Sequence, residues 1–69
     1  MHTSHKKIEF FEERAEQAAD EARNATLANV RDRALRSEAA WREMASRAIA
    51  VEDERARKLA EANPTHEAE

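Results

Sequence analysis

The chain of 69 residues has no cysteine and no glycine, and its single proline, Pro64, lies near the end. Without cysteine, the chain has no disulfide framework, no thiolate nucleophile and no cysteine-ligated zinc site. Without glycine, it cannot form the Asn-Gly or Asp-Gly turns typical of β-hairpins. No apolar run approaches the roughly 20 residues that a membrane-spanning helix needs. The length allows one small domain at most.

Alanine, glutamate and arginine dominate the composition, and charged residues make up 39% of the chain. This composition is typical of long, solvated helices, so the sequence predicts an all-α protein. The N-terminal stretch MHTSHKKIEFFEERAEQ has no uninterrupted apolar segment and no cleavage site, so it is not a secretory signal. We therefore expect a cytoplasmic location.

Two stripes of apolar and small residues recur at alternating spacings of three and four, the rhythm of an amphipathic helix. The first consists of Ile8, Phe11, Ala15, Ala18, Ala22 and Ala25. The second consists of Leu27, Val30, Ala34, Ser37, Trp41, Met44, Ala48 and Val51. Each stripe predicts the face of one helix that is buried against the other.

The second stripe does not continue the phase of the first, which would next place a seam residue at Asn29. A single long helix would therefore have its apolar face jump sideways by roughly a quarter turn near residue 25. This break favours an antiparallel two-helix hairpin over a continuous helix. The expected helices span residues 4–24 and 26–62 of a single domain, 1–62, with Asn24 or Thr26 capping the second. Residues 63–69 follow as a polar, disordered tail.

Folding the chain at residues 25–27 predicts which positions face each other. Small residues meet near the bend, and an aromatic pair meets further along: Ala22 with Val30, Ala18 with Ala34, Ala15 with Ser37, and Phe11 with Trp41. Residues 1–24 hold four basic and six acidic groups, whereas residues 25–47 hold five arginines and three acids. The antiparallel arrangement places these opposite charges side by side. The second helix also contains acid-before-base pairs four residues apart, including Glu38/Arg42, Glu43/Arg47 and Asp53/Arg57.

A hairpin of this size with no disulfide or metal rarely folds alone, because its core is small. The core and seam positions predicted by the two stripes are Ile8, Phe11, Ala15, Ala18, Ala22, Val30, Ala34, Trp41, Met44 and Ala48. Five further apolar residues lie off the seam or beyond the first helix, and these are the candidate interface: Phe10, Leu35, Ile49, Val51 and Leu59. The simplest way to bury them is a homodimer in which two hairpins form a four-helix bundle with coiled-coil-like packing.

Histidines and carboxylates near the N-terminus offer ligands for a surface zinc or nickel site. His2, His5, Glu9 and Glu12 share one face if the helix starts very early. A solvated helix end explains the same pattern more simply, so we assign no metal and no cofactor. The glutamates line a solvated face, which is unsuited to acid–base catalysis, and the helix interiors contain no histidine and no glycine-rich phosphate loop. The sequence thus predicts no catalytic residue, and we expect a protein that is not an enzyme.

Two charged surfaces suggest partners. Arg33, Arg36, Arg47 and Lys58 form a basic edge on the second helix, but acids interrupt that edge and the net charge is −3, which argues against nucleic acid. The first helix has an outer row of like charges that would suit a basic partner: Glu9, Glu12, Glu13, Glu16 and Asp20. A membrane-surface helix is not expected, because glutamates replace the basic residues that such a helix needs.

The segments FFEERAEQ and ATLANVRDRALRSEAAWREMASRA resemble short, uncharacterised α-helical proteins of alphaproteobacteria. In those proteins an F/Y-F-x-x-R-A start leads to an alanine-rich hairpin. The resemblance covers about residues 9–55 and implies a bacterial, cytoplasmic origin. It implies no activity and no site residues.

These observations lead to three hypotheses about function. The first is a non-catalytic protein–protein interaction module, a small homo-oligomeric scaffold, adaptor or regulator. The second is a small inhibitor or antitoxin-like protein whose acidic row covers a basic site on its partner. The third is a nucleic-acid-associated regulator that uses the basic edge of the second helix.

Overall fold

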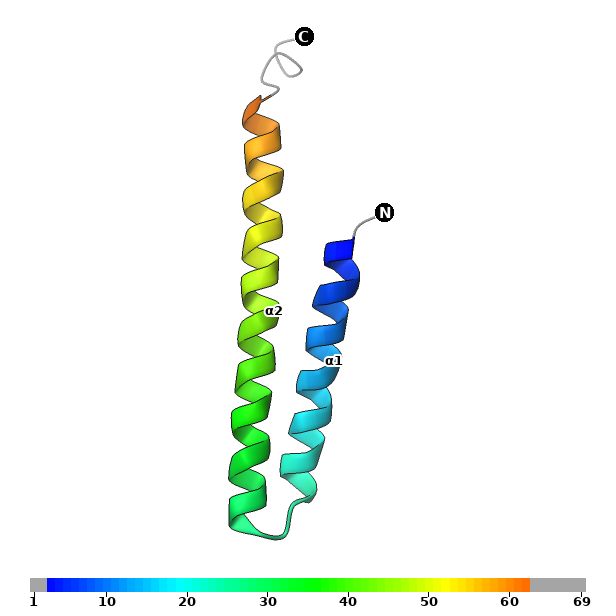
Figure 1. Cartoon of the computed structure of the whole chain (residues 1–69), viewed down its shortest axis with the longest axis vertical. Helices are drawn as coiled ribbons and strands as arrows, with labels where there is room; N and C mark the ends of the chain where they lie inside the picture. Colours follow the sequence, from blue (N-terminus) through cyan, green and yellow to red (C-terminus); the bar gives the residue numbers. More distant parts are fainter. Residues whose placement is uncertain (1–2, 63–69) are drawn as a thin grey trace.

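The computed structural model describes residues 3–62, which form two α-helices, α1 (Thr3–Asn24) and α2 (Ala28–Ala62). The helices run antiparallel and side by side, joined by residues 25–27 (Figure 1). The predicted all-α hairpin is confirmed, and a continuous helix is excluded. Helix α1 begins one residue earlier than expected and α2 two residues later. The tail predicted at residues 63–69 lies outside the described part of the chain.

The connection between the helices is short and contains no residue with a positive φ, as is true throughout residues 3–62. The Ala25 N–H donates to the Ala22 carbonyl at 3.4 Å, and the Arg31 N–H donates to the Leu27 carbonyl at 3.0 Å. The second bond makes Leu27 the N-cap position of α2, although leucine has no side-chain acceptor for the exposed amides of the first turn. The expected caps are therefore wrong: Asn24 ends α1, and Thr26 lies one residue too early.

The core between the helices consists of small side chains. Within the described residues, the buried apolar positions are Ala15, Ala18, Ala19, Ala22, Ala34 and Ala45, and no larger side chain is fully buried. Helix α1 buries its predicted stripe, with Ile8 and Phe11 partly covered, and adds Ala19, which the stripe did not include.

Helix α2 turns toward α1 a face that overlaps with the predicted one but is rotated away from Val30 and Met44. Its covered positions are Ala34, Ser37, Glu38, Trp41, Ala45, Ala48 and Glu52, whereas Met44 is 37% exposed and Val30 is 38% exposed. Val30 and Met44 are therefore not core residues, and Ala45 takes the place assigned to Met44. The physical reason is the alanine face of α1. Helices that meet through small side chains approach closely, so large residues fit at the flanks of the contact and not between the axes.

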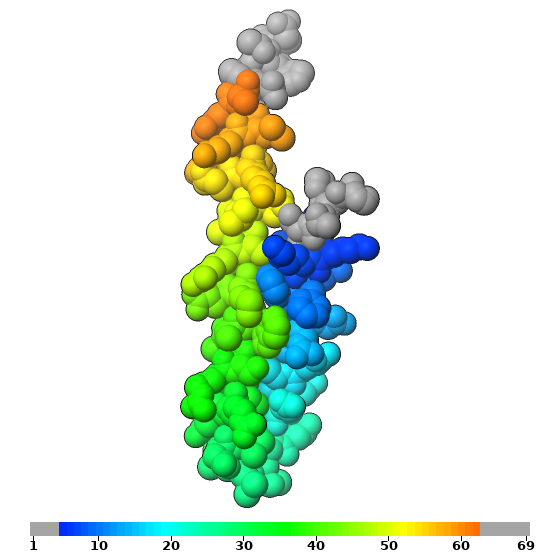
Figure 2. Space-filling model, in the orientation of Figure 1, coloured from blue at the N-terminus to red at the C-terminus, as the bar shows by residue number. Residues whose placement is uncertain are grey.

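Helix α2 is 35 residues long and α1 only 22, so α2 continues well past the start of α1 (Figure 1 and Figure 2). The difference corresponds to about 20 Å of helix. Leu59 lies in this projecting segment and is 67% exposed. The hairpin thus has a closed end at the turn, where alanines pack, and an open end where α2 stands alone.

Candidate interaction surfaces

An aromatic cluster closes the hairpin at the point where the alanine core ends. The Phe11 and Trp41 ring centroids are 5.9 Å apart, which confirms the predicted cross-helix pair. Phe10 also contacts Trp41, edge to face, with centroids 5.8 Å apart. Such tilted and edge-on arrangements are favourable for aromatic rings. Phe10 was expected to lie off the seam on the flank of its helix, and half of its surface is indeed exposed, but its ring also packs against Trp41.

Arg14 also lies over the Trp41 ring. Its guanidinium carbon lies 5.3 Å from the ring centroid, within cation–π distance. The same guanidinium donates a hydrogen bond to Gln17 at 3.4 Å. Trp41 therefore packs under residues of α1 and is only partly exposed, as expected of a residue that holds the two helices together.

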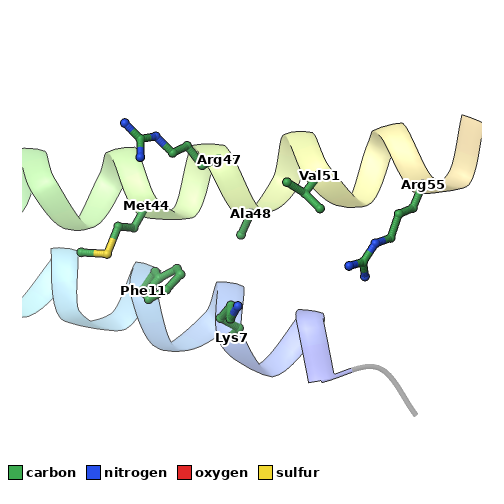
Figure 3. A pocket seen from close by; sticks show the side chains of 7 residues that line it. All are labelled: Lys7, Phe11, Met44, Arg47, Ala48, Val51 and Arg55. Atoms are coloured by element: carbon green, nitrogen blue, oxygen red, sulfur yellow. The ribbon is translucent and has the colours of Figure 1, made fainter.

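One side of the contact between the helices, which we name the cationic side, is hollowed in two places. The larger hollow has a volume of about 270 Å³ and is lined by Lys7, Phe11, Met44, Arg47, Ala48, Val51 and Arg55 (Figure 3). A second hollow of about 160 Å³ follows toward the turn, between Arg14, Gln17, Ala18, Glu21, Ser37 and Trp41. The floor of the larger hollow is apolar, and its three charged residues are all cations.

The opposite side, which we name the mixed-charge side, contains charges of both signs. Its hollow of about 340 Å³ is lined by Glu16, Ala19, Ala22, Arg23, Arg31, Leu35, Glu38 and Arg42. Arg42 bridges the helices here, with its guanidinium 2.7 Å from Glu38 and 3.7 Å from Glu16. The hydrogen bond from Arg42 to Glu38 is the main cause that raises the pKa of the arginine above its ordinary value.

The candidate interface residues do not form one surface. Ile49 follows Leu35 by two heptads, so both point to the mixed-charge side of α2. Val51 lines the cationic side instead. Phe10 contacts Trp41, and Leu59 lies on the projecting end of α2. The apolar residues outside the core are thus divided between two sides and one end of the hairpin.

The acidic row of α1 lies on the surface as predicted. Glu9, Glu12, Glu13 and Glu16 border one shallow hollow of about 320 Å³. Asp20, the fifth member, forms an ion pair with Arg23 one turn later. Four carboxylates therefore face solvent together, with no large apolar side chain among those that line the hollow.

The ion pairs within α2 follow the predicted pattern in part. Glu43 and Arg47 are 3.0 Å apart, and the Glu38/Arg42 pair is also formed. Arg57 pairs with Glu54, so the predicted Asp53/Arg57 pair is wrong. All four members of the basic edge, Arg33, Arg36, Arg47 and Lys58, are exposed.

No arrangement typical of a metal centre occurs in residues 3–62, which contain no group of three or more histidines, cysteines or carboxylates placed to hold an ion. His2, one member of the weighed metal site, lies outside the described residues. A search of the two described helices for a segment long and apolar enough to cross a membrane finds none.

Comparison with known proteins identifies no relative of this chain. No protein-family model, curated protein or solved structure matches the chain. The resemblance to alphaproteobacterial helical proteins therefore stays a prediction, and the surfaces described above are the basis for a function.

Proposed function

We propose that the protein is a non-catalytic protein–protein interaction module that acts as a homodimer, with two hairpins forming a four-helix bundle. The observation that supports this proposal is the composition of the core. Six alanines are buried, whereas eight large apolar residues of the described chain are more than a third exposed. A core made of alanines supplies little hydrophobic stabilisation to a chain of this size, so a second copy provides the missing burial.

The mixed-charge side is the better surface for this dimer. In a two-fold contact each patch meets its own copy, so a patch with both signs of charge can form ion pairs with itself. Leu35 and Ile49 would form its apolar centre, and Arg31, Arg42 and Glu16 lie beside it. The cationic side would bring arginines and lysines of the two copies together, which is unfavourable.

Sedimentation velocity over a hundredfold range of concentration tests the proposal, with helical circular dichroism measured on the same samples. We expect a concentration-dependent dimer whose helical signal rises with association. The double variant Leu35→Glu/Ile49→Glu should abolish the dimer because it buries carboxylates at the contact. Met44→Glu/Val51→Glu is the matched control, since it places the same charges on the cationic side and should leave the dimer intact.

A folded monomer at every concentration would contradict the dimer. Equal loss of association in both double variants would show that the assembly uses another surface. The other functions weighed from the sequence predict different results. Binding of a basic protein that is lost when the acidic row is removed would favour the inhibitor-like function over the homodimer. Binding of free DNA that requires Arg33 and Arg36 would favour the nucleic-acid-associated function.

A further inference from the structure

The cationic side differs from the rest of the surface because it combines an apolar floor with cations alone in its larger hollow. Phe11, Met44 and Val51 provide the floor, and Lys7, Arg47 and Arg55 provide the charge. The chain as a whole has a net charge of −3, so these cations are concentrated locally. Arg47 pairs with Glu43, and Arg55 lies 3.9 Å from Glu52, but both arginines are largely exposed, so carboxylates of a partner can exchange with these acids at little cost. Arg14 adds a fourth cation at the neighbouring hollow, which is also lined by one acid, Glu21.

The shape of this side suits an elongated ligand. The two hollows extend along α2 from Ser37 to Arg55. This stretch corresponds to about 27 Å, or five helical turns. The end of the groove is open, because α2 continues past the start of α1 (Figure 1). A ligand can therefore lie along α2 beyond the end of the hairpin contact and reach Leu59.

We propose that this groove binds an amphipathic helix of a partner protein, one that has an apolar stripe flanked by glutamates or aspartates. The apolar stripe would cover Phe11, Met44 and Val51, and the flanking acids would meet the cations at the rim. This inference deepens the proposed interaction function and rests on it, but it concerns the side of the hairpin that the dimer leaves free.

The charge and shape of the groove favour an acidic helix over a second copy of the chain and over a membrane surface. Two copies joined through this side would oppose their own cations, and the acidic row of α1 offers carboxylates without large apolar anchors. A bilayer needs apolar side chains that protrude, whereas Phe11 and Ala48 are only partly exposed and line a concave hollow. Figure 3 shows Arg55 directed from α2 toward the start of α1, while Arg47 points away from α1.

The test uses the full chain and two synthetic helical peptides of about 18 residues, a length of about five turns. Both carry the same leucine stripe and no tryptophan. One has glutamates flanking the stripe and the other has lysines. Binding is followed through the fluorescence of Trp41, the only tryptophan of the protein, which lines the groove. We expect saturable binding of the glutamate peptide, at least tenfold weaker binding of the lysine peptide, and loss of affinity as salt increases.

A charge-reversal pair identifies the groove as the binding site. Lys7→Glu/Arg55→Glu should weaken binding of the glutamate peptide at least tenfold. The matched control is Lys6→Glu/Arg57→Glu, which makes the same charge change at exposed positions one and two residues away, and should change affinity less than twofold. Circular dichroism of both variants checks that the helices are retained.

Several results would overturn the inference. These are absence of saturable binding, equal affinity for both peptides, or equal loss in the two variants. Binding of phosphatidylglycerol vesicles without binding of the peptide would assign the groove to a lipid surface instead. Sedimentation of the same variants distinguishes a failure of peptide binding from a failure of the dimer. Lys7 and Arg55 do not lie on the mixed-charge side, so Lys7→Glu/Arg55→Glu should leave dimerisation unchanged.

Discussion

The two sides of the hairpin are built by the same pair of helices but differ in charge and in burial. On the mixed-charge side, Arg42 connects the helices through Glu38 and Glu16, and Ala19 is buried beneath them. On the cationic side, Met44 and Val51 remain accessible beside Lys7 and Arg55. The difference shows that one narrow alanine core can present two unlike surfaces, because its small side chains leave the larger ones at the flanks.

The largest expected effect comes from Trp41, the residue of the cationic side that holds the two helices together. Trp41→Ala should lower the free energy of unfolding by about 3 kcal/mol, because it removes the contacts with Phe10, Phe11 and Arg14. A domain with so small a core would then be largely unfolded. Urea unfolding followed by circular dichroism measures this, with Trp41→Phe as the control that keeps an aromatic ring. An unchanged midpoint would contradict the central role of Trp41.

A neighbouring pair of residues tests which face of α2 is buried. Ala45→Leu should cost about 1–3 kcal/mol, because a larger side chain forces the closely packed helices apart. Met44→Leu, one residue away at the flank, should cost less than about 1.5 kcal/mol. Urea midpoints of the two variants give the comparison. A greater loss of stability from Met44→Leu than from Ala45→Leu would show that Met44 faces α1, as the apolar pattern predicted. It would contradict the division of the surface into two sides.

A substitution in the connection between the helices should stabilise the hairpin without favouring the cationic or the mixed-charge side. Leu27→Asp should raise the free energy of unfolding by about 1 kcal/mol, because an aspartate at the N-cap position accepts hydrogen bonds from the first turn of α2 and favours its dipole. Leu27 is 62% exposed, so its replacement loses little packing. Thermal melts compare it with Thr26→Asp, where the carboxylate lies one residue too early and should help less.

The smallest effects distinguish the arginines of the two sides. Arg14→Gln should cost about 0.5–1 kcal/mol through the lost cation–π contact with Trp41, and it should alter the tryptophan emission spectrum. Arg42→Gln should cost less, since its ion pairs are solvent-exposed, and the difference from wild type should shrink as salt is added. Emission that changes equally in both variants would argue against a separate environment for Trp41 on the cationic side.

Local features of the sequence were enough to predict the architecture. The absence of glycine, the alanine-rich composition and the phase break near residue 25 together predicted two helices folded back on each other. Phe11 and Trp41 were placed together correctly because both stripes share a heptad rhythm, so one choice of turn determines the cross-helix partners. These properties depend on the spacing of residues along one chain, which a sequence records directly.

Only the tertiary structure determined the buried face of α2 and the division of the surface. The apolar pattern selected Met44 and Val30 because they are large, but the distance between two helices depends on the side chains of both. Alanines on α1 bring α2 close, so that Ala45 is buried and the Glu38 side chain is partly covered. This rotation of α2 moves Val51 from the predicted stripe to the cationic side, while Leu35 and Ile49, already expected off the seam, lie on the mixed-charge side. The rotation of a helix about its own axis depends on how its side chains pack against those of the other helix. It therefore cannot be predicted from the sequence of either helix alone.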